Sequence, residues 1–422
     1  MMQYGCIAEH LGHSFSALIH ARLADYSYEL CELSPCEVDG FMKERAFRAI
    51  NVTIPYKQTV IPYLDEVDEI ARRIGAVNTI VNREGRLYGY NTDFAGMCAL
   101  IERLGLTLKG KKVAILGTGG TSRTARAVAA HLEAGEILVV SRTARGDAID
   151  YAALTSRHSD TEILINTTPV GMYPDNDGCP VDPASFPRLC GVVDAVYNPL
   201  STVLVRRARA LGVPAEGGLY MLVAQAAFAV EHFLDVSVPR ERIDEVYGEI
   251  LAQKRNIVLV GMPGCGKTTL GRMLAARLGL DFVDGDEEIV RREGMPIPQI
   301  FAERGERAFR DCETAAIRED IAPRGGCVVA TGGGAVLREE NVFRLKQNGL
   351  VIFLDRPLDQ IAATGDRPLS SDREMLAQRY RERYPIYRAC ADIILPIGSD
   401  VTENTNRIIE ALKSTQAERQ TI

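Results

Sequence analysis

The sequence lacks the features that identify secreted, membrane-spanning and nucleic-acid-binding chains. Its 422 residues carry 56 acidic and 49 basic side chains, a net charge of −7, so no excess of Lys and Arg is available to neutralise nucleic-acid phosphates. Its ten Cys include no Cys-x-x-Cys pair, and we expect most of them to be small buried apolar residues rather than a disulfide framework. No signal-peptide pattern opens the chain, and the longest apolar stretch, 221–230, contains Gln225 and falls short of the roughly 18 residues of a membrane span. These absences predict a cytoplasmic protein with no nucleic-acid partner and no membrane partner.

Two glycine-rich segments, at 117–122 and 261–268, lie far apart and each follows a short apolar run. They predict two nucleotide sites on separate α/β units, and the length of the chain predicts about three domains. The expected domains are an α/β substrate-binding domain at 1–100 (completed by about 217–250), a Rossmann-type domain at 101–216, a linker at 251–255, a phosphate-loop domain with a parallel sheet at 256–412, and a frayed tail at 413–422.

The first glycine-rich segment has the form of a dinucleotide-binding turn. Its glycines allow a tight turn and a close approach of the backbone to a pyrophosphate at a helix N-terminus. Ser122 stands in the third glycine position and is small enough for helix–strand packing. A plain glycine turn is the alternative. The residues expected to bind the dinucleotide are Gly117, Gly119, Gly120, Thr121 and Ser122.

The end of the next predicted strand, 136–140, indicates which dinucleotide binds. NAD sites usually place an acidic residue there for the ribose 2′-hydroxyl, whereas this chain has Ser141, Arg142 and Thr143. A guanidinium suits a 2′-phosphate, and Arg145 stands close by in the chain. The pattern predicts NADP(H), with a solvated Arg on a loop as the alternative.

Seven motifs in the first 250 residues resemble, in order, those of shikimate dehydrogenases. They are Gly12-His13-Ser14-Phe15-Ser16, Asn51-Val52-Thr53-Ile54-Pro55-Tyr56-Lys57, Gly75-Ala76-Val77-Asn78-Thr79, Tyr90-Asn91-Thr92-Asp93, Asn166-Thr167-Thr168-Pro169, Asp194-Ala195-Val196-Tyr197-Asn198-Pro199 and Met221-Leu222-Val223-Ala224-Gln225. The family resemblance implies a substrate domain joined to a Rossmann domain. One departure is Ala17, where many relatives have Pro after the second Ser.

The resemblance also implies a role for each matching residue. Lys57, paired with Asp93, would supply the proton when hydride reduces a ketone. Ser14 and Ser16 would bind the substrate carboxylate. Without the family, Lys57 is a solvated cation, Asn78 a turn cap and Met221 a core residue. The remaining implied contacts are Thr53, Asn78, Tyr197 and Gln225 to the substrate, and Gly218 and Met221 near the nicotinamide.

The second glycine-rich segment, Gly261-Met262-Pro263-Gly264-Cys265-Gly266-Lys267-Thr268, satisfies the full Walker A pattern between a predicted strand and helix. Its backbone N–H groups cradle phosphates, Lys267 reaches the β- and γ-phosphates, and Thr268 is a ligand of Mg²⁺. The thiol of Cys265 is either reactive at this helix N-terminus or buried and inert. The residues expected to bind ATP are Gly264, Cys265, Gly266, Lys267, Thr268 and Thr269.

Residues from about 255 to 412 resemble shikimate kinases. The matching motifs are Asp284-Gly285-Asp286, Gly305-Glu306-Arg307-Ala308-Phe309-Arg310, Thr331-Gly332-Gly333-Gly334, Arg367-Pro368-Leu369 and Arg383-Tyr384-Pro385-Ile386-Tyr387. By resemblance Asp284 supports Mg²⁺, Asp286 binds the acceptor hydroxyls or acts as base, and Arg367 stabilises the transferring phosphoryl group. The implied contacts to the acceptor also include Arg310, Gly332, Gly333, Gly334 and Arg383.

The kinase-like part departs from its family at one position and in one length. Relatives commonly have Arg before Thr364, where this chain has Ala363, and the segment between Thr364 and Arg383 is short. These departures concern nucleotide affinity and lid closure rather than the reaction.

The activities implied for the two halves share one intermediate, shikimate, which the first would produce and the second would consume. The sequence predicts a bifunctional enzyme that reduces 3-dehydroshikimate to shikimate with NADPH and then phosphorylates shikimate with MgATP. Two alternatives remain open: a quinate-type dehydrogenase joined to a related small-molecule kinase, and a chain in which one half binds ligand without turnover. The oligomeric state, monomer or homodimer, stays open as well.

Overall fold

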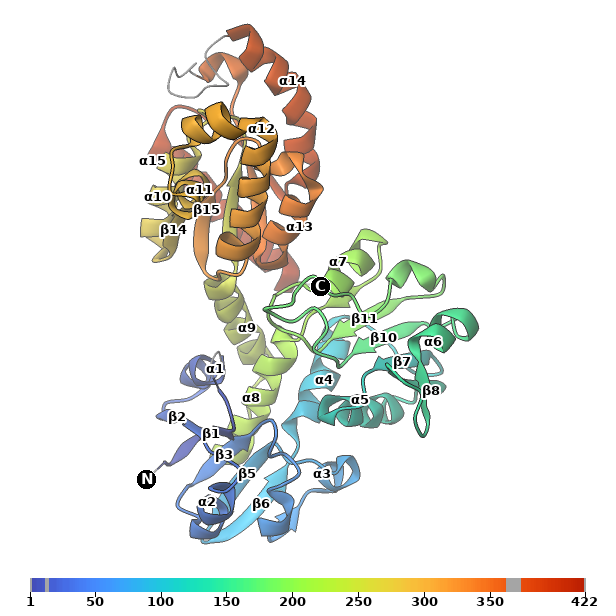
Figure 1. The fold of residues 1–422 in the computed structure, drawn as a ribbon. Helices are drawn as coiled ribbons and strands as arrows, with labels where there is room; N and C mark the ends of the chain where they lie inside the picture. The colour runs from blue at the N-terminus through green and yellow to red at the C-terminus, as the bar shows by residue number, and fades with distance from the viewer. Residues whose placement is uncertain (1, 12–14, 362–372, 421–422) are drawn as a thin grey trace. The chain divides into compact units, whose positions relative to one another are not determined.

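The computed structural model describes residues 2–11, 15–361 and 373–420 (Figure 1). The chain divides into two compact units, Met1–Ile250 and Leu251–Ile422. Both are α/β, as the sequence predicts. Among the described residues, no helix combines the length and apolar character that crossing a membrane requires.

The first unit opens with a six-stranded mixed sheet in the order β2-β1-β3-β5-β6-β4. Strands β1 and β3 are buried along their whole length, so this part of the sheet is core. Strand β3 ends at Val52, and Pro55, which has no N–H to donate to a ladder, lies in the turn that follows. The strands are β1 (Tyr4–Ala8), β2 (Tyr28–Glu32), β3 (Ala49–Val52), β4 (Glu66–Val67), β5 (Thr79–Arg83) and β6 (Arg86–Tyr90), with helices α1 (Ser16–Leu23), α2 (Val38–Glu44) and α3 (Glu69–Ile74).

A second sheet in the same unit is entirely parallel, in the order β12-β11-β10-β7-β8-β9. Its strands β10 and β11 are buried throughout, as expected where helices cover both faces of a parallel sheet. The strands are β7 (Lys112–Leu116), β8 (Glu136–Ser141), β9 (Ala148–Asp150), β10 (Ile163–Asn166), β11 (Gly191–Asp194) and β12 (Ala215–Glu216), with helices α5 (Gly120–His131), α6 (Tyr151–Arg157) and α7 (Val203–Ala210).

Helices α4 (Thr92–Arg103) and α8 (Leu219–Leu234) pack against each other between the two sheets of the first unit (Figure 1). Gly96 permits this close approach, because a Cβ there would stand 2.7 Å from the carbonyl oxygen of Met221 and 2.9 Å from the Cβ of Gln225. The packing brings the N-terminal turn of α4 beside Gln225, and this places two predicted site segments together.

The second unit is a five-stranded parallel sheet in the order β14-β15-β13-β16-β17. The central strand β13 is buried, and the phosphate loop follows it directly. The strands are β13 (Asn256–Val260), β14 (Asp281–Asp284), β15 (Cys327–Ala330), β16 (Gly349–Asp355) and β17 (Ile393–Pro396). The helices are α10 (Lys267–Leu278), α11 (Gly285–Glu293), α12 (Ile297–Ala316), α13 (Glu339–Asn348), α14 (Arg373–Cys390) and α15 (Val401–Gln420).

Two polar segments overlap the ends of helices. The expected linker at 251–255 overlaps the end of helix α9 (Arg240–Lys254), in which Leu251 is buried. The expected frayed tail at 413–422 overlaps the end of α15, which runs to Gln420. Neither segment contains the Gly or Pro that would end a helix.

Candidate functional sites

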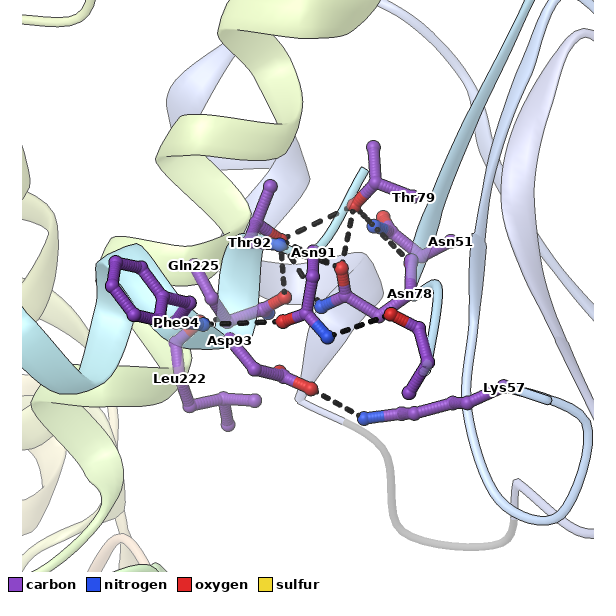
Figure 2. Close-up of polar contacts among 11 residues, drawn as sticks. Asn51, Lys57, Asn78, Thr79, Asn91, Thr92, Asp93, Phe94, Leu222 and Gln225 are labelled. Carbon is purple, nitrogen blue, oxygen red and sulfur yellow. Dashed lines mark hydrogen bonds and ion pairs between the residues drawn. The ribbon is translucent and has the colours of Figure 1, made fainter. Parts of the chain in front are cut away.

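The first candidate site is built around an ion pair between Lys57 and Asp93. Lys57 lies in the turn after β3, and Asp93 lies in the first turn of α4. The Lys57 Nζ donates to Asp93 Oδ2 at 2.6 Å, with 23% and 16% of the two side chains exposed (Figure 2). The fold therefore brings together the two residues that the resemblance implies are the catalytic pair.

Behind this pair lies a buried hydrogen-bond network. Asn78 accepts from the Thr92 backbone N–H at 2.7 Å, and its Nδ2 donates to Thr92 Oγ1 at 3.1 Å. Thr92 Oγ1 lies 3.4 Å from Gln225 Oε1, and Asn51 Nδ2 donates to Thr79 Oγ1 at 3.1 Å (Figure 2). Asn78 thus joins β5 to the start of α4 and does more than cap a turn. Both amides that the resemblance assigns to substrate, Asn78 and Gln225, are held by buried partners.

These residues face a cavity of about 490 Å³. It brings together the seven described residues expected to bind substrate, which are Ser16, Thr53, Lys57, Asn78, Asp93, Tyr197 and Gln225. Thr121, Gly218 and Met221 line the same cavity, next to the dinucleotide turn. Ser14, the other predicted carboxylate ligand, lies outside the described residues. A substrate in this cavity would lie between the polar network and the predicted nicotinamide position.

The loop that presents Tyr197 is anchored by a buried carboxylate. Asp194 is fully buried and accepts from Asn166 Nδ2 at 2.9 Å, Thr202 Oγ1 at 2.6 Å and the Val196 backbone N–H at 3.0 Å. Burial raises the pKa of Asp194 to about 6, against the lowering effect of these three donors. Burial also raises the pKa of Tyr197, so its phenol stays protonated and can donate a hydrogen bond. The two motifs at 166–169 and 194–199 therefore meet in space.

The dinucleotide turn opens at the carboxyl end of β7. Gly117 has φ 113°, and a Cβ there would come within 2.8 Å of Thr167 Oγ1, so glycine is required. At Gly119 and Gly120 a Cβ would meet nothing within 4 Å, which leaves the backbone at the start of α5 open to a ligand. Ser122 is buried, as helix–sheet packing requires. An open turn at a helix N-terminus fits a pyrophosphate.

The residues predicted to give a preference for NADP(H) over NAD(H) lie at the same edge of the sheet. The Gly117 N–H donates to Val140 O at 2.8 Å in the parallel pairing of β7 with β8, so the residues after β8 lie beside the turn. The Ser141 hydroxyl donates to the carbonyl of Thr143, and the side chains of Arg142, Thr143 and Arg145 are exposed. Two exposed guanidinium groups at this edge fit a cofactor that carries a 2′-phosphate.

The second candidate site begins at the phosphate loop. Gly264 and Gly266 have φ 80° and 99°, and Lys267 Nζ donates to the carbonyl oxygens of Gly261 at 2.9 Å and Met262 at 3.0 Å. Thr269, in the first turn of α10, is exposed. Cys265 is fully buried, which favours the inert alternative for its thiol. The loop is thus formed as a phosphate cradle with its lysine folded across it.

Oxygen ligands for a divalent cation stand beside this loop. Thr268 Oγ1 donates to Asp284 Oδ2 at 2.8 Å, and Asp284 Oδ1 accepts from the Asp286 backbone N–H at 3.0 Å. A hydroxyl and a carboxylate next to a phosphate cradle fit Mg²⁺, which takes few protein ligands and shares the phosphate oxygens.

A cavity of about 580 Å³ adjoins the phosphate loop. All of the described residues predicted to bind the acceptor line it: Asp286, Arg310, Gly332, Gly333, Gly334 and Arg383. A Cβ at Gly334 would collide with the Arg310 guanidinium, and one at Gly332 would come 2.8 Å from Asp286 Oδ1. The triple glycine therefore leaves room for these two side chains. Arg367, like Ala363, lies outside the described residues.

Four charged residues that line this cavity were not predicted from the sequence: Glu313, Arg379, Glu287 and Arg291. Glu313 accepts from Arg310 Nη1 at 2.6 Å and is almost fully buried, and burial raises its pKa. Arg379 lines the cavity from helix α14. The spacing of Glu313 three residues after Arg310 on one helix was the available signal for the first, whereas Arg379 stood among several Arg on a polar helix.

The two sites define two classes of enzyme on one chain: a dinucleotide-dependent oxidoreductase and a phosphate-loop phosphotransferase. Comparison with known families agrees. The description "Shikimate dehydrogenase substrate binding domain" matches residues 6–80, and "Shikimate kinase" matches residues 263–413.

Individual relatives match each unit over nearly their full length. A shikimate dehydrogenase (NADP(+)) of Halothermothrix orenii is 40% identical over 261 residues, 53% of this chain and 88% of that protein. A shikimate kinase of Clostridium beijerinckii is 40% identical over 163 residues, 38% of this chain and 95% of that protein. The structure of shikimate 5-dehydrogenase from Thermus thermophilus, in complex with NADP(H) and shikimate, is 31% identical, with a TM-score of 0.54 over 59% of this chain and 99% of that one.

The chain therefore belongs to the shikimate dehydrogenase family through its first unit and to the shikimate kinase family through its second. It is a bifunctional enzyme of the shikimate pathway, with NADP as the cofactor of the oxidoreductase and ATP with Mg²⁺ as those of the phosphotransferase.

Proposed function

We propose that the first unit reduces 3-dehydroshikimate to shikimate with NADPH, and that the second transfers a phosphoryl group from MgATP to the 3-hydroxyl of shikimate. The Lys57–Asp93 ion pair on the wall of the first cavity carries the first half of this proposal. Asp286, Arg310 and Arg383 on one cavity beside the phosphate loop carry the second.

In the first unit, NADPH supplies the hydride that adds to the ketone carbon of the substrate. The carbonyl oxygen then takes a proton from the Lys57 ammonium, which regains it from solvent. Asp93 holds that ammonium in place. The hydroxyl of Ser16 binds the substrate carboxylate, while Asn78 and Gln225, already oriented by buried partners, bind its ring hydroxyls.

In the second unit, MgATP supplies the phosphoryl group. Asp286 orients the acceptor hydroxyl and takes its proton as the new oxygen–phosphorus bond forms. Arg310 and Arg383 hold the acceptor carboxylate, for which the planar guanidinium fork is suited. Lys267 and the loop glycines hold the phosphates, and Thr268 with Asp284 holds the cation. The proposed oligomeric states, monomer or homodimer, leave this chemistry unchanged.

The proposal is tested with one coupled assay on the purified full chain. With 3-dehydroshikimate, NADPH and MgATP together, we expect loss of NADPH and formation of ADP. Shikimate with MgATP alone should form ADP, and 3-dehydroshikimate with NADPH alone should consume NADPH.

Two outcomes contradict the proposal. If quinate-type substrates were turned over faster than 3-dehydroshikimate and shikimate, the chain would be a quinate-type enzyme instead. Binding without turnover in either unit, measured by calorimetry, would make that unit a ligand-binding module.

A further inference from the structure

The acceptor cavity of the second unit contains two guanidinium groups beyond the two that the family resemblance assigns: that of Arg291, which is held in ion pairs with Glu288 and Asp320, and that of Arg379. Arg379 lies on α14 one helical turn before Arg383, and both line the cavity together with Arg310. Leu376, Arg383 and Tyr387 are buried on the same helix, so the neighbouring turns of α14 face inward. Arg379 lies on this side of the helix, where it is partly buried and lines the cavity.

Arg310 Nε is a buried donor without a hydrogen-bond partner, but Arg310 and Arg383 each have a partner through another nitrogen. Arg310 donates to Glu313 at 2.6 Å, and Arg383 Nη1 donates to Gly333 O at 3.0 Å. The Nη1 of Arg379 is buried and has no hydrogen-bond partner anywhere in the described parts of the chain. A buried donor without a partner is unfavourable, and native proteins rarely keep one unless something else satisfies it.

The electrostatic surroundings strengthen this point. Burial lowers the pKa of Arg379, and the charges of Arg383 and Arg310 lower it further, while Glu306 and Glu382 oppose the shift. Because a guanidinium stays protonated in proteins, four positive charges line one cavity, and two of them, on Arg310 and Arg291, are already in ion pairs. An anion in the cavity would relieve both the repulsion and the missing hydrogen bond.

We infer that Arg379 is a third binding residue for the carboxylate of the acceptor, acting beside Arg310 and Arg383. The inference rests on the proposed phosphorylation of shikimate, whose only anionic group before transfer is that carboxylate. The phosphate groups of ATP are the other anions at this site, but Lys267 and the loop amides already provide for them in the phosphate loop, of which Pro263 lines the cavity and Lys267 does not.

The test uses Arg379→Leu in the full chain. ADP formation from shikimate is followed without NADP(H), so that the first unit cannot oxidise the substrate. Loss of one charge-assisted contact should raise the KM for shikimate about ten- to hundredfold, with the KM for ATP and the kcat changed far less. Arg379→Lys should fall between the variant and the unaltered chain. Arg381→Leu, which removes the same charge from an exposed position of the same helix, is the matched control and should change neither constant.

The methyl ester of shikimate shows whether the carboxylate is the partner. Arg379→Leu should lose activity against the acid but lose no more than about twofold against the ester, since the ester has no charge for Arg379 to bind. The melting temperature should stay level or rise, because the variant removes an unsatisfied buried donor.

Three results would overturn the inference while leaving the kinase function intact: an unchanged KM for shikimate, an equal loss with acid and ester, or a selective rise in the KM for ATP. If the unaltered chain itself fails to phosphorylate shikimate, the proposed function fails instead, and the two failures are therefore distinguishable.

Discussion

Lys57 and Asp93 are 36 positions apart in the chain, yet the fold joins them in an ion pair of 2.6 Å on the wall of one cavity. Lys57 comes from the turn after a buried strand and Asp93 from the first turn of a helix. Their side chains are three-quarters buried or more, which limits both to a single working geometry. Lys57, held in this way, is placed to donate a proton to a substrate in the cavity.

Lys57→Ala should therefore lower reduction of 3-dehydroshikimate by about 10²- to 10⁴-fold, because the proton for the substrate oxygen is removed. Phosphorylation of added shikimate should stay intact. Lys43→Ala, in an exposed pair on α2, is the control and should affect neither activity. Both activities are measured at equal melting temperature, and a loss of kinase activity in Lys57→Ala would mean that the two sites are coupled.

Asp286→Asn should do the reverse. The amide keeps the size but cannot accept the acceptor proton, so phosphorylation should fall by about 10²-fold or more while reduction persists. Asp281→Asn, the same change at the exposed start of strand β14, is the matched control and should leave phosphorylation intact. Full kinase activity in Asp286→Asn would remove this carboxylate from the mechanism.

Arg142→Asp should discriminate between the two nicotinamide cofactors. It replaces an attraction for the 2′-phosphate by a repulsion, so the KM for NADPH should rise at least tenfold, about 1.4 kcal/mol or more, and that for NADH should change little. Arg157→Asp makes the same charge change in the last turn of helix α6, where the side chain is exposed, and should leave both constants unchanged. Equal losses with NADPH and NADH would argue against a 2′-phosphate contact.

The features that could be predicted from local sequence are those whose structure is determined by residues close together in the chain. The turn at Gly117 and the phosphate loop at 261–268 each combine a strand, glycines with positive φ and a helix start within about twenty residues. The pairing of Lys57 with Asp93 needed the family resemblance, because it depends on how β3 and α4 are placed by the sheet. Glu313 and Arg379 could not be predicted as site residues from local sequence. They reach the cavity only because α12 and α14 pack around it, and no short segment encodes that packing.

The linker expected at 251–255 and the frayed tail expected at 413–422 are polar segments that overlap the ends of helices α9 and α15. Helix formation there is governed by the absence of Gly and Pro and, at Leu251, by burial of one side chain. Composition reports the solvent exposure of such a segment and says little about its backbone.

Asp284→Asn should raise the Mg²⁺ concentration needed for half-maximal kinase activity. Asp284 accepts from Thr268 Oγ1 at 2.8 Å, and the neutral amide would bind that hydroxyl but weaken a cation site. Activity is titrated with Mg²⁺ at saturating shikimate, and we expect about a tenfold shift, with partial recovery at high Mg²⁺. Asp281→Asn, at the exposed start of the same strand, is the control, and an unshifted Mg²⁺ titration in Asp284→Asn would exclude the cation role.

The buried histidine of the first unit predicts a pH dependence of stability. His20 lies on α1, the helix that begins at Ser16, stacks on Tyr28 at 3.9 Å between ring centres and has its Nδ1 2.6 Å from the Tyr26 hydroxyl. It is fully buried, and burial lowers its pKa from 6.5 to about 3. The folded state therefore favours the neutral ring.

With a depressed pKa in the folded state, the stability that this group contributes is complete above about pH 6.5 and is lost as the pH falls toward 3. Between about pH 6.5 and 5, the His20 side chain takes up a proton in the unfolded chain but stays neutral in the folded chain. The His20 contribution to the free energy of unfolding of the first unit should thus fall by about 2 kcal/mol over this range, whereas Asp194, whose pKa is raised in the folded state, changes that free energy in the opposite direction. Denaturant unfolding at several pH values measures it, and the transition that NADP⁺ moves upward belongs to the first unit.

His20→Phe isolates this contribution, because the ring still stacks on Tyr28 but cannot take up a proton. The variant should be less stable at neutral pH, having lost the contact to Tyr26, yet its unfolding free energy should decline less between about pH 6.5 and 5 by those ~2 kcal/mol. His131→Asn, an exposed histidine on α5, should keep the full decline. Equal pH slopes in His20→Phe and the unaltered chain would show that another group carries the acid sensitivity. Since Ser16 begins the same helix and lines the substrate cavity, mild acid should impair reduction before it impairs phosphorylation, and the same variant should delay that loss.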